Sequence, residues 1–115
     1  MSIQRYNTGK RLSEAVVHGN TIYLAGEVPD DTGKDITGQT EQVLSKIDKL
    51  LAQLGSDKTK ILSAQIFIAD IGEFAGMNAA WDKWVPQGHC PARATIEAKL
   101  ANPAYKVEIM CIASL

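Results

Sequence analysis

The chain has 115 residues, of which 45% are hydrophobic and 22% are charged, and 12 lysines and arginines against 13 aspartates and glutamates give a net charge of −1. The length fits one domain spanning residues 1–115, and the ordinary composition excludes a disordered chain. The lack of a cationic excess argues against nucleic acid and against an anionic membrane surface as partners. A domain of this size hides only about two-thirds of its unfolded surface, so self-association offers further burial.

No apolar run approaches the roughly 20 residues that span a bilayer. Residues 1–6 show no apolar segment followed by a small-residue cleavage site, so we expect a cytoplasmic protein without a secretory signal. In a reducing compartment, Cys90 and Cys111 are expected to be free thiols. No C-x-x-C or H-x-x-x-H spacing occurs, and we expect neither a metal nor another cofactor.

The first quarter of the chain has the pattern of a β-hairpin. Two β-rich runs, Ala15–His18 and Thr21–Ala25, flank Gly19-Asn20, a dipeptide suited to a tight two-residue turn. A short strand is also expected at Ile3–Tyr6. The stretch from Gly26 to Gly38 is rich in glycine, proline and aspartate, which predicts a surface loop.

Two segments carry apolar residues at helical spacing. The first runs from about Thr37 and ends before Gly55, a typical residue after a helix C-terminus. The second begins near Asp70, which forms a capping-box-like pair with Glu73, and it ends at Pro86. We expect its aromatic and methionine stripe to pack on a sheet; the stripe consists of Phe74, Met77, Trp81, Trp84 and Val85.

Three further segments alternate between apolar and polar residues, as strands do. In Lys60–Ala69 the apolar face would hold Leu62, Ala64, Ile66 and Ile68. The segments Pro91–Lys99 and Tyr105–Ala113 flank Asn102-Pro103, which predicts that they pair with each other as antiparallel strands. The resulting fold class is α+β, a mixed β-sheet with two helices packed on one face. Its second face is left open for water or for another subunit.

Arg93 is the most informative polar residue. It follows Pro91-Ala92 at a strand start and is expected to point to the face opposite the helices. A guanidinium on a rigid strand suits a carboxylate, because its planar fork matches two oxygens. The alternative is an ordinary solvated or structural salt bridge, the commonest role of a surface charge.

The segments around Arg93 resemble the RidA/YjgF family. Residues 91–99, PARATIEAK, and 105–109, YKVEI, are similar to the family's C-terminal signature. Residues 19–26, GNTIYLAG, resemble its first hairpin, and residues 74–81, FAGMNAAW, its second helix. The resemblance covers nearly the whole chain. The WDKW sequence at 81–84 and the short length are typical of a divergent branch.

The resemblance implies a chorismate-mutase-like fold assembled as a homotrimer, with ligand clefts between neighbouring subunits. It also implies hydrolysis of 2-imino and enamine acids, such as 2-iminopropanoate and 2-iminobutanoate, to 2-oxo acids and ammonia. In the family the arginine matching Arg93 grips the substrate carboxylate. The other cleft residues are matched here by Ala25, Gly26 and Asn78, and by Thr95, where the family has a cysteine and uses its backbone.

The chain departs from the family pattern at three polar positions. Leu12 stands near a common tyrosine, Ala25 replaces a hydroxyl residue, and Met110 stands where a water-placing glutamate is expected. Glu108 is the candidate to replace that glutamate, so Arg93 and Glu108 form the predicted catalytic pair. The alternative for Glu108 is a strand salt bridge with a neighbouring lysine, Lys106 or Lys99. The departures also leave open a non-catalytic trimer that binds small carboxylates such as 2-oxo acids.

Two other features do not support a competing activity. His89 and Cys90 are adjacent, and adjacent side chains usually point apart, which argues against a Cys-His nucleophile. Cys111 alternates with apolar residues and is expected in the core. A ribonuclease role has been attributed to some members of the family, but this sequence has no basic patch that would support one.

Overall fold

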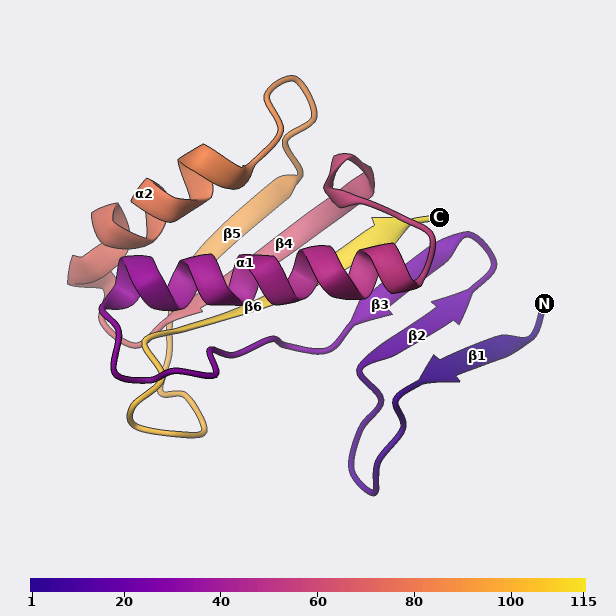
Figure 1. Ribbon diagram of the computed structural model, residues 1–115, viewed down its shortest axis with the longest axis horizontal. Helices are drawn as coiled ribbons and strands as arrows, with labels where there is room; N and C mark the ends of the chain where they lie inside the picture. Colours follow the sequence, from indigo (N-terminus) through magenta and orange to yellow (C-terminus); the bar gives the residue numbers. More distant parts are fainter.

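A single mixed β-sheet forms the centre of the computed structural model, which describes residues 1–115 (Figure 1). Its strands lie in the order β1-β2-β3-β6-β4-β5. All neighbouring strands are antiparallel except β4 and β5, which are parallel. The strands are β1 (Ile3–Tyr6), β2 (Ala15–His18), β3 (Thr21–Leu24), β4 (Ile61–Ile68), β5 (Ala92–Glu97) and β6 (Val107–Ser114).

The predicted hairpin is confirmed as β2 and β3. Ala15 pairs with Leu24 and His18 with Thr21 across a turn in which Gly19 has a φ of 61°. The expected first strand is also confirmed, since β1 pairs with β2 at the edge of the sheet. The segment predicted as a loop is irregular up to Asp35.

The first predicted helix is α1 (Ile36–Gln53), which begins one residue before the expected start. The Asp35 carboxylate accepts a hydrogen bond from the Gly38 N–H at 2.9 Å, which satisfies a free donor of the first turn. Leu54 caps the C-terminus and Gly55, with a φ of 80°, follows it. Because that backbone conformation favours glycine, Gly55 fits the end of the helix.

The second helix, α2 (Phe74–Trp84), follows a 3₁₀ turn at Ile71–Glu73, and another such turn lies at Lys58–Lys60. The predicted capping box does not form. The Asp70 carboxylate accepts from the Gly72 N–H at 2.9 Å within the 3₁₀ turn, and Glu73 lies 3.8 Å from the Lys106 ammonium. The polar pair therefore belongs to the turn that precedes the helix.

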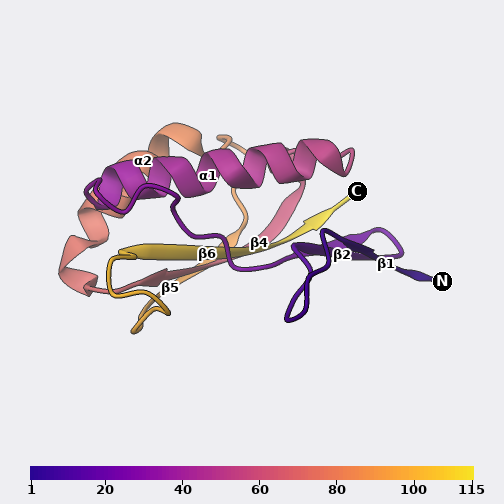
Figure 2. The ribbon, with the colours of Figure 1, turned by 60° about the horizontal axis from the view of Figure 1, so that its bottom comes forward.

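Both helices cover the same face of the sheet, and the other face has no covering layer (Figure 2). The core lies between α1, α2 and the covered face, where burial of apolar area supplies most of the stabilisation. Its fully buried large side chains include Ile22, Leu44, Ile47, Leu51, Ile66, Ile68, Met77 and Ile109. The open face exposes large apolar residues, among them Tyr23, Ile96 and Met110.

The predicted pairing of the last two strands is wrong. Strand β5 pairs in parallel with β4, and β6 lies between β3 and β4 in the middle of the sheet. Strand β4, helix α2 and strand β5 form a crossover unit, which is how two parallel neighbours are joined. The segment between β5 and β6 is therefore a connection from the sheet edge to the sheet centre rather than a hairpin loop.

The expected face of Leu62 is also wrong. The β4 register shifts between Ile61 and Ser63, as at a β-bulge, so Ile61 is buried and Leu62 is 53% exposed. One extra residue reverses the alternation on one side of the irregularity. From Ala64 onward the predicted apolar face is confirmed, because Ala64, Ile66 and Ile68 are buried.

Gln39 of α1 connects the helix to two loops. Its Nε2 donates to the carbonyl oxygens of Thr32, Lys34 and Ala104 at 3.1–3.3 Å, and its Oε1 accepts from the Lys106 N–H at 2.8 Å. The side chain is fully buried, so these bonds satisfy polar groups whose burial without partners would be costly.

Neither α1 nor α2 combines the length and the apolar character that crossing a bilayer requires.

Candidate active site

Arg93 lies on the helix-covered side of the sheet, which corrects the prediction that it faces away from the helices. It pairs with Ala64 in the parallel β4–β5 register, and paired residues share one face of a sheet. Ala64 is buried beneath the helices. The alanines of β5 were assigned to the covered face because they are apolar, whereas they lie on the open face with Ile96, which is 48% exposed.

Three side chains of α2 hold the Arg93 guanidinium in place. Its Nη1 donates a hydrogen bond to Oδ1 of Asn78 at 2.7 Å. Its Cζ lies 5.7 Å from the ring centroid of Phe74 and 5.3 Å from that of Trp81, within the range of cation–π attraction. Trp81 is buried, so one of these contacts comes from a fixed wall. The guanidinium is thus oriented before any ligand binds.

A surface cavity of about 400 Å³ lies beside this guanidinium, and we call it the Arg93 pocket. It is lined by Ile71, Phe74, Arg93 and Thr95. The Thr95 hydroxyl is buried and has no hydrogen-bond partner, the only such side-chain atom in the structure. The pocket therefore combines one cation, two apolar side chains and an unpaired hydroxyl.

Gly26 and Glu108 form a second group, and Ala25 directly precedes Gly26 with its N–H donating to Glu14 O at 2.9 Å. A Cβ atom built on Gly26 would overlap Oε2 of Glu108 and lie 3.0 Å from its Cδ, so the carboxylate lies directly over this glycine. The segment after β3 is held against β6 by two backbone bonds: the Glu27 N–H donates to Ile109 O at 2.8 Å and the Ile109 N–H to Glu27 O at 3.1 Å. A glycine at position 26 is required for this close approach.

The salt bridge considered for Glu108 is not formed. The ion pairs of the structure join Lys46 to Asp30 at 3.0 Å and Lys106 to Glu73 at 3.8 Å. Glu108 is half-buried on the open face, where it pairs in register with Phe67. Met110 lies two residues farther along β6 and is 36% exposed on the same face. Of these two positions, Glu108 is the one in contact with Gly26.

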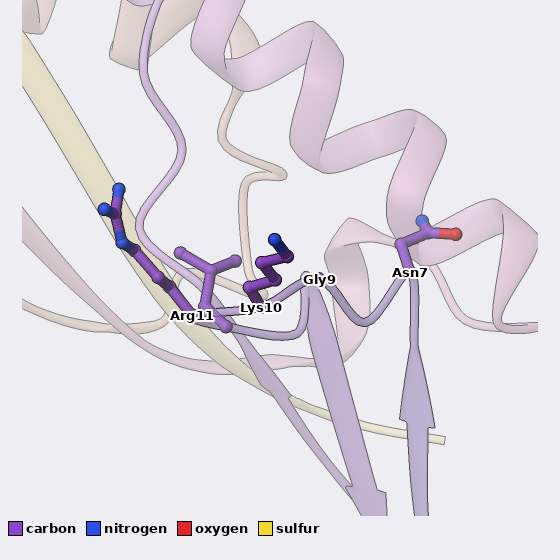
Figure 3. A pocket seen from close by; sticks show the side chains of 5 residues that line it. Asn7, Gly9, Lys10 and Arg11 are labelled. Atoms are coloured by element: carbon purple, nitrogen blue, oxygen red, sulfur yellow. The ribbon is translucent and has the colours of Figure 1, made fainter.

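Leu12 lies in the loop between β1 and β2, at the sheet edge opposite to β5. The loop carries Lys10 and Arg11 beside a surface hollow of about 510 Å³, seen in Figure 3. Leu12 lines the same hollow and is 60% exposed. Leu12, near which the family has a tyrosine, therefore belongs to an exposed loop, and its side chain contributes no polar group.

One chain does not bring all the predicted site residues together. Arg93, Asn78 and Thr95 meet at the β5 edge on the helix side. Gly26 and Glu108 meet on the open side of β6, and β4 separates β6 from β5. The predicted anchor and the predicted base are therefore on opposite faces of the same sheet.

Three residues of the site were not predicted in these roles. Phe74 and Trp81 were assigned to core packing, which is confirmed for Trp81, whereas Phe74 is 38% exposed; both rings also face Arg93. Their spacing of seven residues places them on one side of the helix, which is a usable signal once Arg93 is known to lie under it. Ile71, in the turn before α2, is 46% exposed and had no signal in the sequence.

Glu27 is the other unpredicted polar residue. It is 5% exposed, and its carboxylate accepts no side-chain hydrogen bond. Burial raises the pKa of the Glu27 carboxyl above its ordinary value, the negative charge of Glu14 raises it further, and the nearby Lys46 ammonium opposes the shift. Glu27 follows Gly26 directly, so its titratable carboxyl group adjoins the group formed by Gly26 and Glu108.

The comparisons with known proteins cover the whole chain. The family model described as Endoribonuclease L-PSP matches residues 2–115. A RutC family protein from Haemophilus influenzae is 52% identical over 115 residues, and the match covers 99% of each chain. The solved structure of a YjgF protein family member from Neisseria meningitidis has a TM-score of 0.96 and 46% identity, covering 99% of this chain and 95% of that one.

A more distant relative carries a more specific name. Reactive Intermediate Deaminase A, chloroplastic, from Arabidopsis thaliana is 32% identical over 109 residues. The match covers 90% of this chain and 58% of that protein.

Proposed function

Because the chain belongs to the RutC/YjgF family, we propose that it hydrolyses 2-imino and enamine acids, such as 2-iminopropanoate and 2-iminobutanoate, to 2-oxo acids and ammonia. The observation that carries the proposal is the Arg93 guanidinium, fixed by Asn78 and two aromatic rings at the side of an open pocket. The deaminase name of the Arabidopsis relative supports the same chemistry.

Arg93 supplies the anchor for the substrate carboxylate. A guanidinium has five N–H donors in a planar fork, and the hydrogen bond to Asn78 uses one on Nη1. The remaining donors can bind both oxygens of a carboxylate with charge-assisted hydrogen bonds. A bound carboxylate fixes the adjacent C2 atom, the carbon of the C=N bond that water attacks, and positioning of this kind is a large part of catalysis.

Glu108 supplies the base in this proposal. The reacting species is the protonated imine. The Glu108 carboxylate accepts a proton from water while the water oxygen bonds to C2 and the C=N electron pair moves to nitrogen, which gives a neutral carbinolamine. The protonated Glu108 returns this proton to the amine nitrogen, and the C2–N bond then breaks to release ammonia while the hydroxyl oxygen passes its proton to Glu108 and C2 forms the carbonyl of the 2-oxo acid. Water is the only co-reactant and no oxidation occurs. A positioned base of this type contributes roughly 10²–10⁴-fold.

Because Arg93 and Glu108 lie on opposite faces of the sheet of one chain, the proposed reaction needs a cleft shared between two subunits. We propose a homotrimer in which the Gly26 and Glu108 side of one subunit meets the Arg93 edge of the next. The open face supports this arrangement, because it exposes Tyr23 and Ile96, at 46% and 48%, where a subunit could cover them.

Mixed trimers test this sharing. Trimers of Arg93→Ala and Glu108→Ala subunits, assembled by co-expression, should recover activity that neither variant has alone. If mass spectrometry shows that mixed trimers have formed and they are as inactive as trimers of either variant alone, the shared cleft is contradicted.

The alternative is a non-catalytic trimer that binds 2-oxo acids and similar small carboxylates. The observation that favours it is the apolar character of Leu12, Ala25 and Met110, positions where polar groups are expected in active deaminases. This alternative needs Arg93 but not Glu108. Carboxylate binding by Arg93 is therefore common to both functions, and a measurement of imine hydrolysis distinguishes them.

Titration calorimetry with pyruvate and with its amide tests the anchor. Pyruvate should bind and the amide should not, because the fork requires two oxygens that share a negative charge. Arg93→Lys keeps the positive charge but loses the bidentate geometry, so pyruvate affinity should fall by about 1–3 kcal/mol. Equal affinity for acid and amide, or unchanged affinity in Arg93→Lys, would remove Arg93 from this role.

A further inference from the structure

We propose that Ile71 and Phe74 form an apolar subsite beside Arg93, which makes 2-imino acids with bulky apolar side chains the preferred substrates. This inference rests on the proposed function, because it takes Arg93 as the anchor of the substrate carboxylate. It adds what that function leaves open, namely which side chain the substrate carries.

The two apolar residues are exposed at the place where a bound ligand would lie. Ile71 is 46% exposed and Phe74 38% exposed, and both line the Arg93 pocket. Exposed large apolar side chains beside a fixed polar group are typical of ligand sites, in which the polar group orients the ligand and the apolar wall covers the rest. A ligand held by its carboxylate at Arg93 would lie within reach of both.

The local backbone holds Ile71 in position. Its N–H donates to Oε2 of Glu97 at 3.0 Å, which ties the turn before α2 to the end of β5. The Asp70 carboxylate accepts from the Gly72 N–H at 2.9 Å and closes the same turn. Because one bond ties this turn to β5 and the other closes the turn itself, Ile71 needs little ordering when a ligand binds.

The charge and the size of the pocket narrow the substrate class. Arg93 is the only charged residue that this chain contributes to the lining, and the other lining side chains are apolar or carry a hydroxyl. A second carboxylate on the substrate would compete for the same guanidinium. The volume of about 400 Å³ exceeds what a methyl group fills. A branched aliphatic or aromatic side chain suits these walls best.

Stable 2-oxo acids serve as probes, because they share the carboxylate and the side chain of the corresponding imines. We expect 2-oxo-4-methylpentanoate to bind about tenfold more tightly than pyruvate, since its larger side chain covers apolar area on one open wall. The quantity measured is the ratio of the two dissociation constants in the intact protein, by titration calorimetry.

Substitutions locate the effect. Ile71→Ala should reduce the ratio to about threefold or less, because Ile71 is part of the apolar wall. Phe74→Ala should reduce the ratio as well and should also weaken the binding of both acids, since the ring lies within cation–π range of the guanidinium. Leu62→Ala is the matched control, an apolar side chain of β4 that is 53% exposed and does not line the Arg93 pocket, and it should leave the ratio unchanged.

The outcomes separate this inference from the proposed function. A ratio near one in the unmodified protein, with both acids bound, would overturn the subsite and leave Arg93 as the anchor. A tenfold ratio that survives in Ile71→Ala and Phe74→Ala would overturn the assignment to these residues. Failure of both acids to bind would overturn the proposed function itself. A tenfold ratio lost in both variants but kept in Leu62→Ala is the result we expect.

Discussion

Glu108 lies over Gly26 so closely that its Cδ would be 3.0 Å, and its Cγ 3.2 Å, from any Cβ atom at that position. The contacting atoms belong to the flexible end of the glutamate, so they can move aside. We therefore expect Gly26→Ala to change the free energy of unfolding by less than about 1 kcal/mol. Displacing the carboxylate should lower imine hydrolysis by about 10²-fold, measured as kcat.

A double-substitution cycle checks that the loss comes from this contact. In a Glu108→Ala background, Gly26→Ala has no carboxylate to displace and should have no further effect on the rate. An additional loss of similar size in that background would mean that Gly26 acts independently of Glu108.

Asn78 is a positioning residue for Arg93. Removing its carbonyl oxygen in Asn78→Ala leaves Nη1 without its 2.7 Å partner and allows the guanidinium to rotate. Pyruvate affinity should fall by about 1 kcal/mol, less than for a buried bond to a charged group because Arg93 is exposed. Gln87→Ala, which removes an exposed amide from the chain, serves as the control in the same calorimetric titration. Equal affinities in the two variants would show that the aromatic rings alone orient Arg93.

Local patterns predicted the elements well because each has a local physical cause. The turn at Gly19 and the carboxyl cap at Asp35 involve groups a few residues apart. The parallel pairing of β5 depends instead on which strand takes the central position in the sheet, a choice made by long-range packing. With that pairing unknown, the face of Arg93 was assigned from the apolar alanines beside it and was wrong.

The site was predicted in parts rather than as a unit. The resemblance identified Arg93, Gly26 and Asn78 as candidates, and Glu108 was added as a replacement for the glutamate expected at Met110. The structure shows two pairwise contacts among these four residues. The aromatic partners of Arg93 were hidden, because the same residues fit an amphipathic helix that packs on a sheet. Gln39 was also missed, since its four hydrogen bonds join segments that the sequence does not bring together.

Glu27 should make the stability of the protein depend on pH. Burial raises the pKa of its carboxyl above the ordinary 4.5, so between 4.5 and the raised value the folded chain binds more protons than the unfolded chain. The free energy of unfolding therefore falls as the pH rises through this interval. Four other charged groups act on this pKa: Glu14, Asp30 and Glu108 raise it and Lys46 lowers it.

Glu27→Gln removes the titration and keeps the shape of the side chain. Its stability relative to the unmodified protein should be lowest in acid and should rise toward neutral pH, as measured by urea unfolding between about pH 4 and pH 8. A relative stability of the variant that falls toward neutral pH would instead indicate that the folded protein stabilises the ionised Glu27.

The two thiols should differ strongly in reactivity. Cys90 is exposed, whereas Cys111 is buried and desolvation raises its pKa to about 12. At about pH 8 a thiol-specific reagent should therefore modify Cys90 rapidly and Cys111 only after unfolding, because the thiolate is the reactive form. Cys90→Ser is the control, and the folded variant should show no fast reaction. Fast modification of that variant would place Cys111 in a region that opens readily.

The most direct measurement follows 2-iminopropanoate generated in solution by an amino acid oxidase, with semicarbazide present to capture whatever imine is not hydrolysed. If the protein is an imine hydrolase, it should lower semicarbazone formation, and Arg93→Ala and Glu108→Gln should each lose this effect by about 10²-fold or more. Unchanged semicarbazone formation with the unmodified protein, while pyruvate still binds at Arg93, would contradict hydrolysis and establish the carboxylate-binding alternative.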